Sequence, residues 1–415
     1  MQLGTAKLNI TPAMPVRLCG YATRTTTFES VKEDIFLRIH IHKDGGTELI
    51  YLYADILWWN TDFVQAARKV LADEMGLQAQ QLFFVASHNH SGPPTGSSFI
   101  PCLETYSEAY AAFLLQQIKA GITAARSNLT YVTLTRYDGD CRMNVYRRVH
   151  TQQGIAMLPN YTVEADTHLT ILAMRDDTGT VKGLLVHYPC HANLCNENNV
   201  QPDYAGVALR LLDTEYPGSV AVFLQGCTAD LRPNSVLGAK FTPVNYDKVV
   251  AFAEDFTAHC RNVLAGTGIA VTGTLSASRK TAALPFENTK TTAELESIAA
   301  TAEGYDRDWA VKVLERGNKQ SADIEISHIG YGGFDIYTLN AEVSQYYAAF
   351  ARALTPGAVC AAYTNGMIGY LCTAHQIAHG GYEPQGSALY FALPGTYAPA
   401  IENIIHNTIK ACKED

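Results

Sequence analysis

The chain has 415 residues, of which 47% are hydrophobic and 17% are charged, as in globular proteins that bury a large core. Its 31 basic and 40 acidic residues give a formal net charge of −9, and this acidic balance argues against a nucleic-acid partner. The longest apolar stretches, such as residues 49–59, are shorter than the roughly 18 residues that a membrane-spanning helix needs. The composition therefore excludes an integral membrane protein, a disordered tail and a small disulfide-stapled module.

The amino-terminal residues and the cysteines predict the cellular compartment. The opening sequence MQLGTAKLNITPAM has no basic segment followed by an apolar one, so it does not resemble a secretory signal. The ten cysteines form no CxxC pair, and we expect them to be reduced and mostly buried. A cytoplasmic protein is therefore expected.

Hydrophobic periodicity predicts strands that alternate with helices along the chain. The first strand alternates apolar and polar residues, which predicts that His40 and His42 lie on an exposed face. The strands are predicted at residues 34–42, 48–57, 82–87, 131–140, 167–176, 181–191, 219–226 and 322–339. The helices are predicted at residues 61–76, with Gly76 as the carboxyl-terminal cap, and at 107–126, 204–216, 243–265 and 344–354.

This order of elements predicts an α/β fold in which mixed β-sheets are layered with helices. Residues 289–317 combine high helix propensity with abundant charge, which favours a helical insertion on the surface. The sequence has no internal repeat, low-complexity run or Pro/Ser-rich linker. A single large domain over residues 1–415 is therefore the simplest interpretation.

The most informative motif is SHNHSGPP at residues 87–94, directly after a predicted strand. His88 and His90 are two residues apart, and in extended backbone this spacing places both imidazoles on one side. Loops at strand ends often carry functional groups, and neutral imidazole is the commonest transition-metal ligand near pH 7. The motif indicates a metal site, although such a pair also occurs as ordinary surface or core histidines.

A second histidine motif, HYPCHAN at residues 187–193, also ends a predicted strand. Its two histidines, His187 and His191, are four residues apart and would share one face of a helix. Pro189 disfavours a continuous helix at this position. We therefore expect at most one of the two histidines to be a ligand.

Three further segments carry weaker indications of function. The segment LQGCTADLRPN at 224–234 combines small residues, which allow a ligand to approach the backbone, with the charges of Asp230 and Arg232. Glu342 follows a predicted strand and begins a helix, where a carboxylate is also favoured by the helix dipole alone. The tyrosines and histidines between glycines at 365–384 are, taken alone, more typical of packing residues.

Together, these motifs resemble the neutral/alkaline ceramidase family, whose members are zinc-dependent amidases that split ceramide into sphingosine and a fatty acid. The resemblance runs along most of the chain, and SHNHSGP, which is close to the family's SHTHSGP signature, is its most specific part. The other matching segments are LNITPAMPVRLCGY, the strand with YADIL, CHAN, LQGCTADLRPN and the segment from Tyr370 to Glu383. The resemblance implies one ceramidase-like catalytic domain.

The resemblance also implies a set of site residues. The zinc ligands that it implies are His88, His191, Glu342 and Tyr370, with Glu342 in Asn-Ala-Glu where the family has Pro-Gly-Glu. The residues implied to lie beside the ion or the substrate are His90, Arg147 and Tyr382. In such a site the metal lowers the pKa of bound water, and neighbouring donors stabilise the oxyanion or protonate the leaving nitrogen.

Two departures from the family change the expected substrate. Arg232 stands where the family's loop has a serine directly before Pro-Asn, and an arginine can bind a carboxylate with two hydrogen bonds or donate to the carbonyl oxygen. The sequence also ends soon after the tyrosine segment, so neither the family's C-terminal β-sandwich nor an apolar membrane-docking segment is expected. We therefore expect a small, soluble amide or N-acyl substrate, and Arg232 suggests that it is anionic.

Three alternatives remain open from the sequence. The chain could be a true ceramidase that acts on N-acylsphingosine, or an esterase or lactonase that uses the same zinc site. Because the serine before Pro-Asn is replaced by Arg232, it could also be a catalytically inactive member that binds a ligand. The sequence makes no prediction about the oligomeric state.

Overall fold

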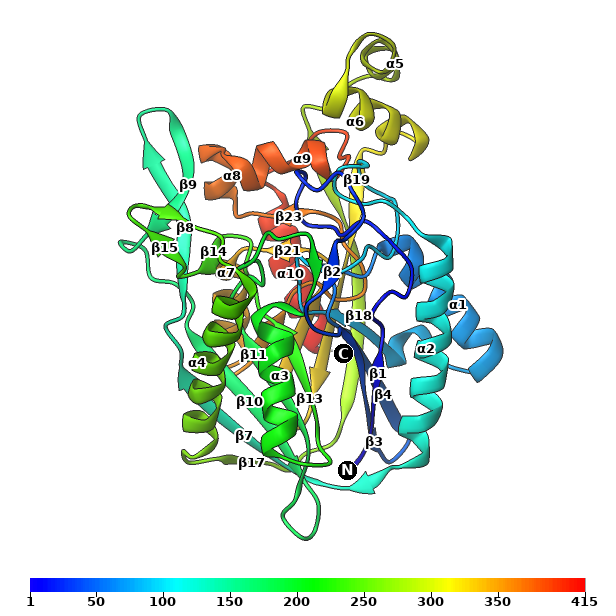
Figure 1. Ribbon diagram of the computed structural model, residues 1–415, viewed down its shortest axis with the longest axis vertical. Helices are drawn as coiled ribbons and strands as arrows, with labels where there is room; N and C mark the ends of the chain where they lie inside the picture. The colour runs from blue at the N-terminus through cyan, green and yellow to red at the C-terminus, as the bar shows by residue number, and fades with distance from the viewer. Residues whose placement is uncertain (415) are drawn as a thin grey trace.

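The computed structural model describes residues 1–414 as three five-stranded sheets layered with helices (Figure 1). The sheets follow one another along the chain, so the colours in Figure 1 run from the blue first sheet through the green second sheet to the yellow and orange third sheet. This mixed α/β architecture is the fold class that the sequence predicts.

The first sheet is formed by the amino-terminal third of the chain. From one edge to the other, its strands are β5 (Leu82–Ala86), β4 (Thr47–Ala54), β3 (Phe36–Asp44), β1 (Gln2–Asn9) and β6 (Thr130–Tyr131). Helices α1 (Thr61–Met75) and α2 (Glu108–Ser127) lie outside it, and α2 packs on β1 and β3. As predicted, α1 ends at Gly76, which has a left-handed φ of 67° and donates its N–H to the carbonyls of Leu71 and Ala72.

The second sheet is covered by the helices at the left of Figure 1. Its strands in spatial order are β13 (Val220–Gln225), β11 (Val181–Tyr188), β10 (His168–Arg175), β7 (Thr133–Asp140) and β17 (Ile269–Val271). Helices α3 (Asp203–Glu215) and α4 (Tyr246–Leu264) pack on it. The strands predicted at residues 167–176 and 181–191 correspond to β10 and β11, which pair antiparallel, and β13 runs parallel to β11.

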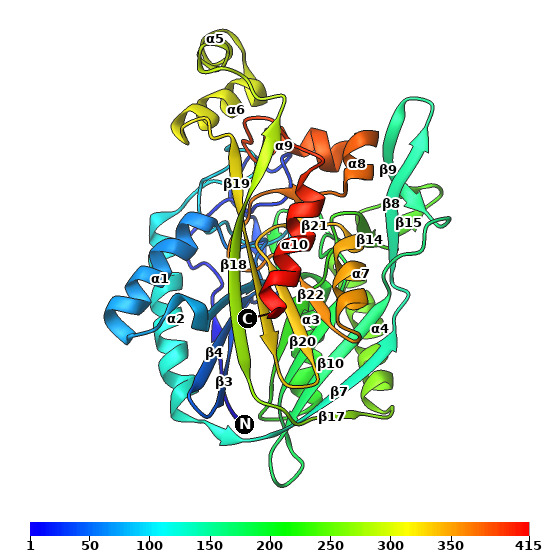
Figure 2. The same cartoon turned by 180° about the vertical axis from the view of Figure 1, so that it is seen from behind.

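The third sheet contains the long strand β18 and is covered by the carboxyl-terminal helix, as Figure 2 shows from behind. Its strands in spatial order are β22 (Val359–Ala361), β20 (Asp335–Leu339), β19 (Ser321–Gly330), β18 (Ser276–Glu287) and β24 (Thr396–Tyr397). Helix α10 (Ile401–Glu414) packs on β18 and β19, and α7 (Gln345–Leu354) packs on β22.

The predicted exposure of His40 and His42 is wrong, because both side chains are fully buried. Strand β3 contacts α2 and also β13 of the second sheet, so its alternating polar residues face protein as well. His40 Nε2 lies 2.8 Å from the Val220 carbonyl oxygen, and His42 Nδ1 lies 2.7 Å from the Tyr331 hydroxyl. These hydrogen bonds offset the cost of burying the imidazoles.

Short elements at one end of the three sheets carry most of the predicted site residues. They are β14 (Leu231–Pro233), β8 (Asn144–Thr151), β9 (Gly154–Asn160), β21 (Glu342–Val343), β23 (Tyr370–Leu371), α8 (Ala374–His379), a π-helical turn (Tyr382–Gly386) and α9 (Ser387–Tyr390). Periodicity did not predict the β8–β9 hairpin, and Glu342 lies on β21 rather than at the start of a helix, since α7 begins at Gln345. Two further strand pairs are β2 (Ser30–Val31) with β12 (Asn199–Val200) and β15 (Val236–Leu237) with β16 (Lys240–Phe241).

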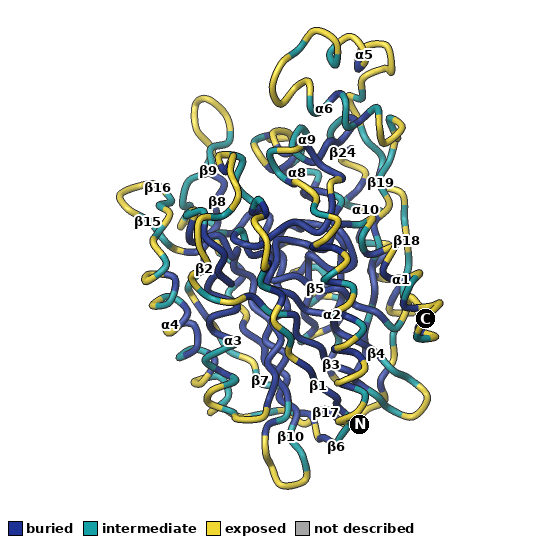
Figure 3. Tube along the Cα trace, turned by 45° about the vertical axis from the view of Figure 1, so that its right-hand side comes forward, coloured by how far each residue is buried: buried dark blue, intermediate teal, exposed yellow. Residues whose placement is uncertain are grey.

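The residues predicted as a helical surface insertion form α5 (Thr292–Thr301) and α6 (Gly304–Glu315), which project at the top of Figures 1 and 2. Figure 3 shows that α5 is largely exposed, whereas the strands at the centre are buried. The two helices share a small apolar cluster, separate from the two large ones, that contains Ile100, Leu295, Ala310, Val313 and Ala392. No helix within residues 1–414 is both long and apolar enough to cross a membrane.

No disulfide joins cysteines within residues 1–414, and nine of the ten are buried, which confirms the prediction that most of them lie in the interior. Cys102 is the partly exposed one. Their thiols fill core positions in all three layers, such as Cys190 beside β11, Cys260 on α4 and Cys412 on α10.

Candidate metal centre

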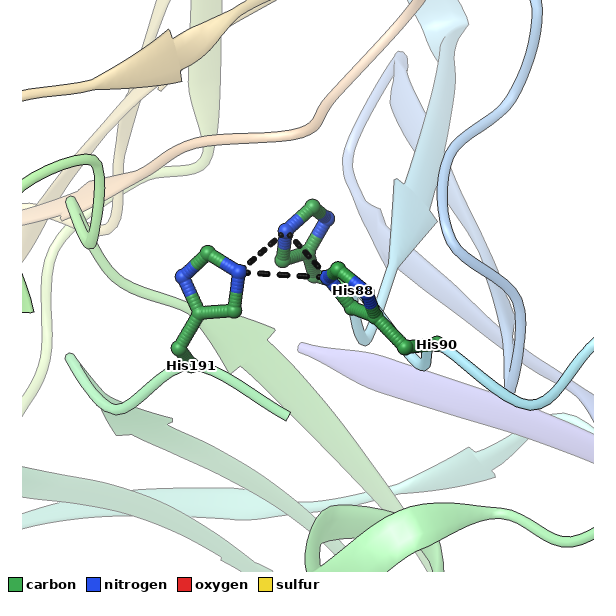
Figure 4. Close-up of side chains that lie close together, drawn as sticks. All are labelled: His88, His90 and His191. Atoms are coloured by element: carbon green, nitrogen blue, oxygen red, sulfur yellow. Dashed lines mark hydrogen bonds between the residues drawn. The ribbon is translucent and has the colours of Figure 1, made fainter. Parts of the chain in front are cut away.

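Three imidazoles from two loops converge on one point (Figure 4). His88 and His90 follow β5, and His191 follows β11. The Nε2 atom of His191 lies 2.9 Å from that of His88 and 3.2 Å from that of His90, and the Nε2 atoms of His88 and His90 are 3.2 Å apart. Among residues 1–414, these three form the one group of histidine, cysteine or acidic side chains whose ligand atoms are close enough to hold a metal ion.

The contacts of Nδ1, the second nitrogen of each ring, identify which nitrogen carries the proton. Each Nδ1 faces a backbone carbonyl oxygen, which can only accept a hydrogen bond, so Nδ1 carries the hydrogen and Nε2 carries a lone pair. Three lone pairs then face one another without a proton between them, an arrangement that a cation stabilises. The Nδ1 contacts are His88 to Leu57 O at 3.1 Å, His90 to Gly20 O at 3.0 Å and His191 to Thr228 O at 3.3 Å.

Burial keeps all three imidazoles neutral. It lowers the pKa of His88 to about 3. The pKa values of His90 and His191 also lie well below the ordinary value, first because of burial and then because His88 is adjacent. The site is therefore a neutral nitrogen donor set at physiological pH.

The loop that carries His88 and His90 has a strained backbone that several hydrogen bonds hold in place. His88 has a left-handed φ of 62°, which a non-glycine residue adopts only when its surroundings fix it. The His90 N–H donates to the Ala192 carbonyl at 3.2 Å, so the two histidine loops are joined directly. Arg24 donates to the carbonyl oxygens of His90 and Cys19 and clamps the loop from the other side.

Glu342 and Tyr370 lie opposite each other on the short parallel strands β21 and β23, next to the histidines. Glu342 Oε2 is 3.6 Å from His88 Nε2, and Glu342 Oε1 is buried without a hydrogen-bond donor. Burial raises the pKa of Glu342 to about 8, although the charge of Arg147 and a hydrogen bond from Tyr370 act in the opposite direction. This raised pKa favours the protonated form at neutral pH, and a cation beside the donor-free Oε1 would stabilise the ionised carboxylate instead.

Arg147 lies behind Tyr370 in a buried charge cluster that the motifs only partly indicated. Its Nε donates to Glu383 Oε1 at 2.8 Å, and an amino group of its guanidinium lies 3.3 Å from the Tyr370 hydroxyl. Arg148 donates to the other oxygen of Glu383. One carboxylate thus orients two arginines, and neither Arg148 nor Glu383 was assigned a role from the sequence, although both adjoin predicted residues.

Tyr382 occupies the π-helical turn and is the most exposed of the predicted site residues, with 36% of its surface accessible. Its ring centroid is 5.6 Å from that of Tyr370. Burial raises the pKa of its hydroxyl, so the hydroxyl keeps its proton and can donate a hydrogen bond. π-helical turns are rare in proteins, and those that occur are often at functional sites.

Arg232 lies on β14, which pairs with the strand β8 that carries Arg147. The charge of Arg232 lowers the pKa of His90 and of His191. Burial lowers the pKa of Arg232, and the charge of Arg147 adds to this effect. Its guanidinium covers the Phe241 ring at 4.9 Å. The structure therefore brings all eight predicted side chains, named above as ligands or substrate contacts, to one end of the molecule.

The remaining histidines of the motifs lie outside this group. His187 Nε2 is 3.1 Å from the Cys360 carbonyl oxygen, and no Nε2 contact joins it to His191. His375 and His379 are on α8, where the His379 ring packs edge-on against that of His150, 4.9 Å away. The expectation that at most one histidine of HYPCHAN joins the metal centre is consistent with this geometry.

The comparisons with known proteins assign the chain to a family. The family model described as neutral/alkaline non-lysosomal ceramidase, N-terminal, matches residues 1–291. The chain therefore belongs to the neutral/alkaline non-lysosomal ceramidase family. The matched region contains all three clustered histidines, Arg147 and Arg232, whereas Glu342, Tyr370 and Tyr382 lie beyond it.

Solved structures extend the similarity of the fold to the whole chain. The structure of neutral ceramidase from Pseudomonas aeruginosa superposes with a TM-score of 0.78 at 17% identity, covering 100% of this chain and 74% of that one. A structure described as ceramidase complexed with C2 gives the same TM-score at 16% identity, covering 100% of this chain and 75% of that one. No curated protein sequence matched the chain.

Proposed function

We propose that the protein is a zinc-dependent hydrolase that cleaves an amide bond in a small, soluble N-acyl substrate. The observation that carries the proposal is the convergence of three neutral imidazole Nε2 atoms within 3.2 Å of one another. A site of imidazole nitrogens with an adjacent carboxylate and phenol is typical of catalytic rather than structural zinc. Membership of the ceramidase family supports amide hydrolysis as the reaction class.

In this proposal, the ion is held by His88, His191, Glu342 and Tyr370. When bound, it supplies a water whose pKa is lowered from about 15.7 to roughly 7 and it polarises the scissile carbonyl. His90 is the most exposed of the three imidazoles, although its Nε2 is as close to the others as a ligand would be. His90 Nε2 is therefore close enough to contact the ion or its bound water.

The protein groups around the scissile carbonyl have different roles in hydrolysis. The oxygen of water bonds to the carbonyl carbon, the C–N bond breaks, and the amine leaves with a proton. Arg147, fixed by Glu383, holds a positive charge beside Tyr370, and the protonated Tyr382 hydroxyl donates to the developing oxyanion or to the leaving nitrogen. Loss of one such donor typically costs about 3 kcal/mol of barrier.

Ceramide is the alternative substrate, since the family and both similar structures carry the ceramidase name. We favour a smaller soluble amide because Arg232 places a charged guanidinium close to the histidines, where the sequence resemblance leads one to expect a serine. An ester or lactone could be attacked by the same site, and the substrate panel below separates these cases.

The test is hydrolysis by the zinc-loaded protein of soluble N-acyl amino acids and peptides, matched esters and lactones, and long-chain ceramide in detergent. We expect the soluble amides to be hydrolysed fastest, with activity lost on chelation and restored by Zn²⁺. Faster hydrolysis of ceramide would overturn the substrate proposal, and faster hydrolysis of esters would favour an esterase. A protein that binds zinc but turns over none of these substrates would be a ligand-binding member instead.

A further inference from the structure

Arg232 is a partly buried cation without an anionic partner among residues 1–414. Among residues 1–414, no carboxylate oxygen lies within 4.0 Å of its guanidinium, and its Nε has no hydrogen-bond acceptor. An amino group of Arg232 reaches the Met157 sulfur at 3.8 Å, which is a weak acceptor. Partial burial of a charge without a counter-ion carries a desolvation cost, which an anion bound beside it would offset.

The buried arginines near the histidines are compensated. Arg147 and Arg148 share the Glu383 carboxylate. Arg24 has no carboxylate either, but its amino groups donate to three carbonyl oxygens and to one hydroxyl. Arg232 therefore differs from its neighbours in lacking both a counter-ion and a set of strong acceptors.

The charge balance of the site also favours an added anion. Glu383 is one carboxylate shared by Arg147 and Arg148, and Glu342 is the carboxylate beside the histidines. A divalent ion held by the histidines and Glu342 would add two positive charges, and Arg232, which has no anionic partner, adds one more. A ligand that brings a negative charge to Arg232 offsets this excess in surroundings where screening by water is weak.

A second unsatisfied polar atom belongs to a residue of the hollow that Arg232 lines. Asn193 and Arg232 line the same small hollow, and the buried Asn193 Oδ1 has no hydrogen-bond donor. A carboxylate complements the guanidinium, and the N–H of a secondary amide complements a side-chain oxygen. An N-acyl compound with a carboxylate close to its amide carries both groups.

We propose that the substrate carries a carboxylate next to the scissile amide and that Arg232 binds it, so that an N-acyl amino acid is the favoured class. This inference rests on the proposed hydrolase function. Hydrolysis then releases a carboxylic acid from the acyl part and an amino acid from the amine part, with one water consumed. A carboxylate on the acyl side of the amide offers the same charge, and the probes below distinguish the two positions.

The experiment uses three matched soluble probes and the zinc-loaded full chain. N-hexanoylglycine places the carboxylate on the amine side, N-hexylsuccinamic acid places it on the acyl side, and N-hexanoylglycinamide is neutral. The variants are Arg232→Gln, Arg232→Lys and the control Arg142→Gln, which removes a nearby arginine that is 73% exposed. The readouts are kcat/KM for each probe and, after chelation, calorimetric binding of the same probes.

Wild type is expected to prefer N-hexanoylglycine over the neutral probe. Arg232→Gln should reduce this preference by about 10- to 100-fold, mainly through KM, because hydrogen bonds between charged groups are worth about 1.5–3 kcal/mol. Arg232→Lys should restore part of it, since the charge is kept but the planar fork is lost. Arg142→Gln should retain the wild-type preference.

Each contrary outcome is distinct. Preference for N-hexylsuccinamic acid would overturn the N-acyl amino acid assignment. Equal or faster hydrolysis of the neutral probe by wild type, or an unchanged preference in Arg232→Gln, would overturn the inference and leave the amide hydrolase intact. Arg232-dependent binding of N-hexanoylglycine without turnover would support the carboxylate site while overturning the hydrolase. Neither binding nor turnover would overturn both.

Discussion

At the scale of single residues, Glu383 is a buried carboxylate that forms ion pairs with both Arg147 and Arg148. Glu383→Gln leaves two buried guanidiniums without a counter-ion, and removal of one partner from a buried ion pair typically costs about 3–5 kcal/mol. We expect a lower free energy of unfolding in urea denaturation and a fall in kcat as Arg147 loses its orientation beside Tyr370.

The chain offers a matched control for this variant. Glu325 also lies between two arginines, with Arg68 at 2.8 Å and Arg279 at 3.4 Å, but on β19, away from the histidines. Glu325→Gln should lower the stability in a similar way and retain the kcat of the remaining folded protein. A loss of kcat of equal size in both variants would contradict the positioning role of Glu383.

The buried His40 gives a pH dependence of known sign. Burial lowers its pKa from 6.5 to about 4, so the unfolded chain binds the proton more readily between these values. The free energy of unfolding therefore falls as the pH is lowered through this window, and His40 contributes about 2 kcal/mol of the loss between pH 7 and pH 5.

Urea denaturation at pH 7 and pH 5 tests this contribution. In His40→Gln the loss of stability on acidification should be smaller than in wild type by that amount. The exposed His379→Gln should keep the wild-type difference. If His40→Gln also keeps it, the buried imidazole is not a source of the acid sensitivity.

The motifs identified single residues better than they identified their surroundings. SHNHSGPP, CHAN and the tyrosine segment contained the side chains that meet at the site, because their chemistry is visible in the sequence. The exposure of His40 and His42 was predicted wrongly because alternation reveals that a strand has two faces, not that a second sheet covers the polar one.

At the scale of elements, the loop that contains Gly20 fixes the position of His90. Gly20 has a φ of 95°, and a Cβ added to it would lie 2.6 Å from His90 Nδ1. Gly20→Ala should therefore displace the imidazole and weaken zinc affinity by about 10- to 100-fold, the usual effect of disturbing the groups that orient a metal site.

Gly218 provides the control for backbone strain. Its φ is 82°, and an added Cβ meets no atom within 4 Å. Gly218→Ala shares the conformational cost of a left-handed alanine without a clash at the site. Competition with a chromophoric chelator measures both affinities, and an equal affinity in the two variants would show that the loop does not position His90.

Elements with strong periodicity were predicted, and those shaped by distant partners were not. α1 and α2 show apolar spacing and recognisable caps, so the sequence alone indicates them. The β8–β9 hairpin carries Arg147 and Arg148 side by side, and its burial depends on Glu383, more than 200 residues away in the chain. Local sequence contains no information about such a partner.

At the scale of the whole molecule, the site forms where the carboxyl ends of strands from the three sheets meet. β5 leads to His88, β11 leads to His191, and β20 leads to Glu342. Resemblance to a family could assign these residues to one site from the sequence, because the family's members share the motifs. The distances between them, the unpaired charge of Arg232 and the place of His90 among the imidazoles required the folded chain.

The central claim is that these strand ends together hold a divalent cation. Elemental analysis of protein purified without added metal, and again after dialysis against Zn²⁺, should give about one zinc ion per chain. His88→Ala and His191→Ala should each lose it, whereas the exposed His379→Ala should retain it. Wild-type protein that stays metal-free after dialysis, or loss-of-imidazole variants that retain a full complement of zinc, would contradict the account.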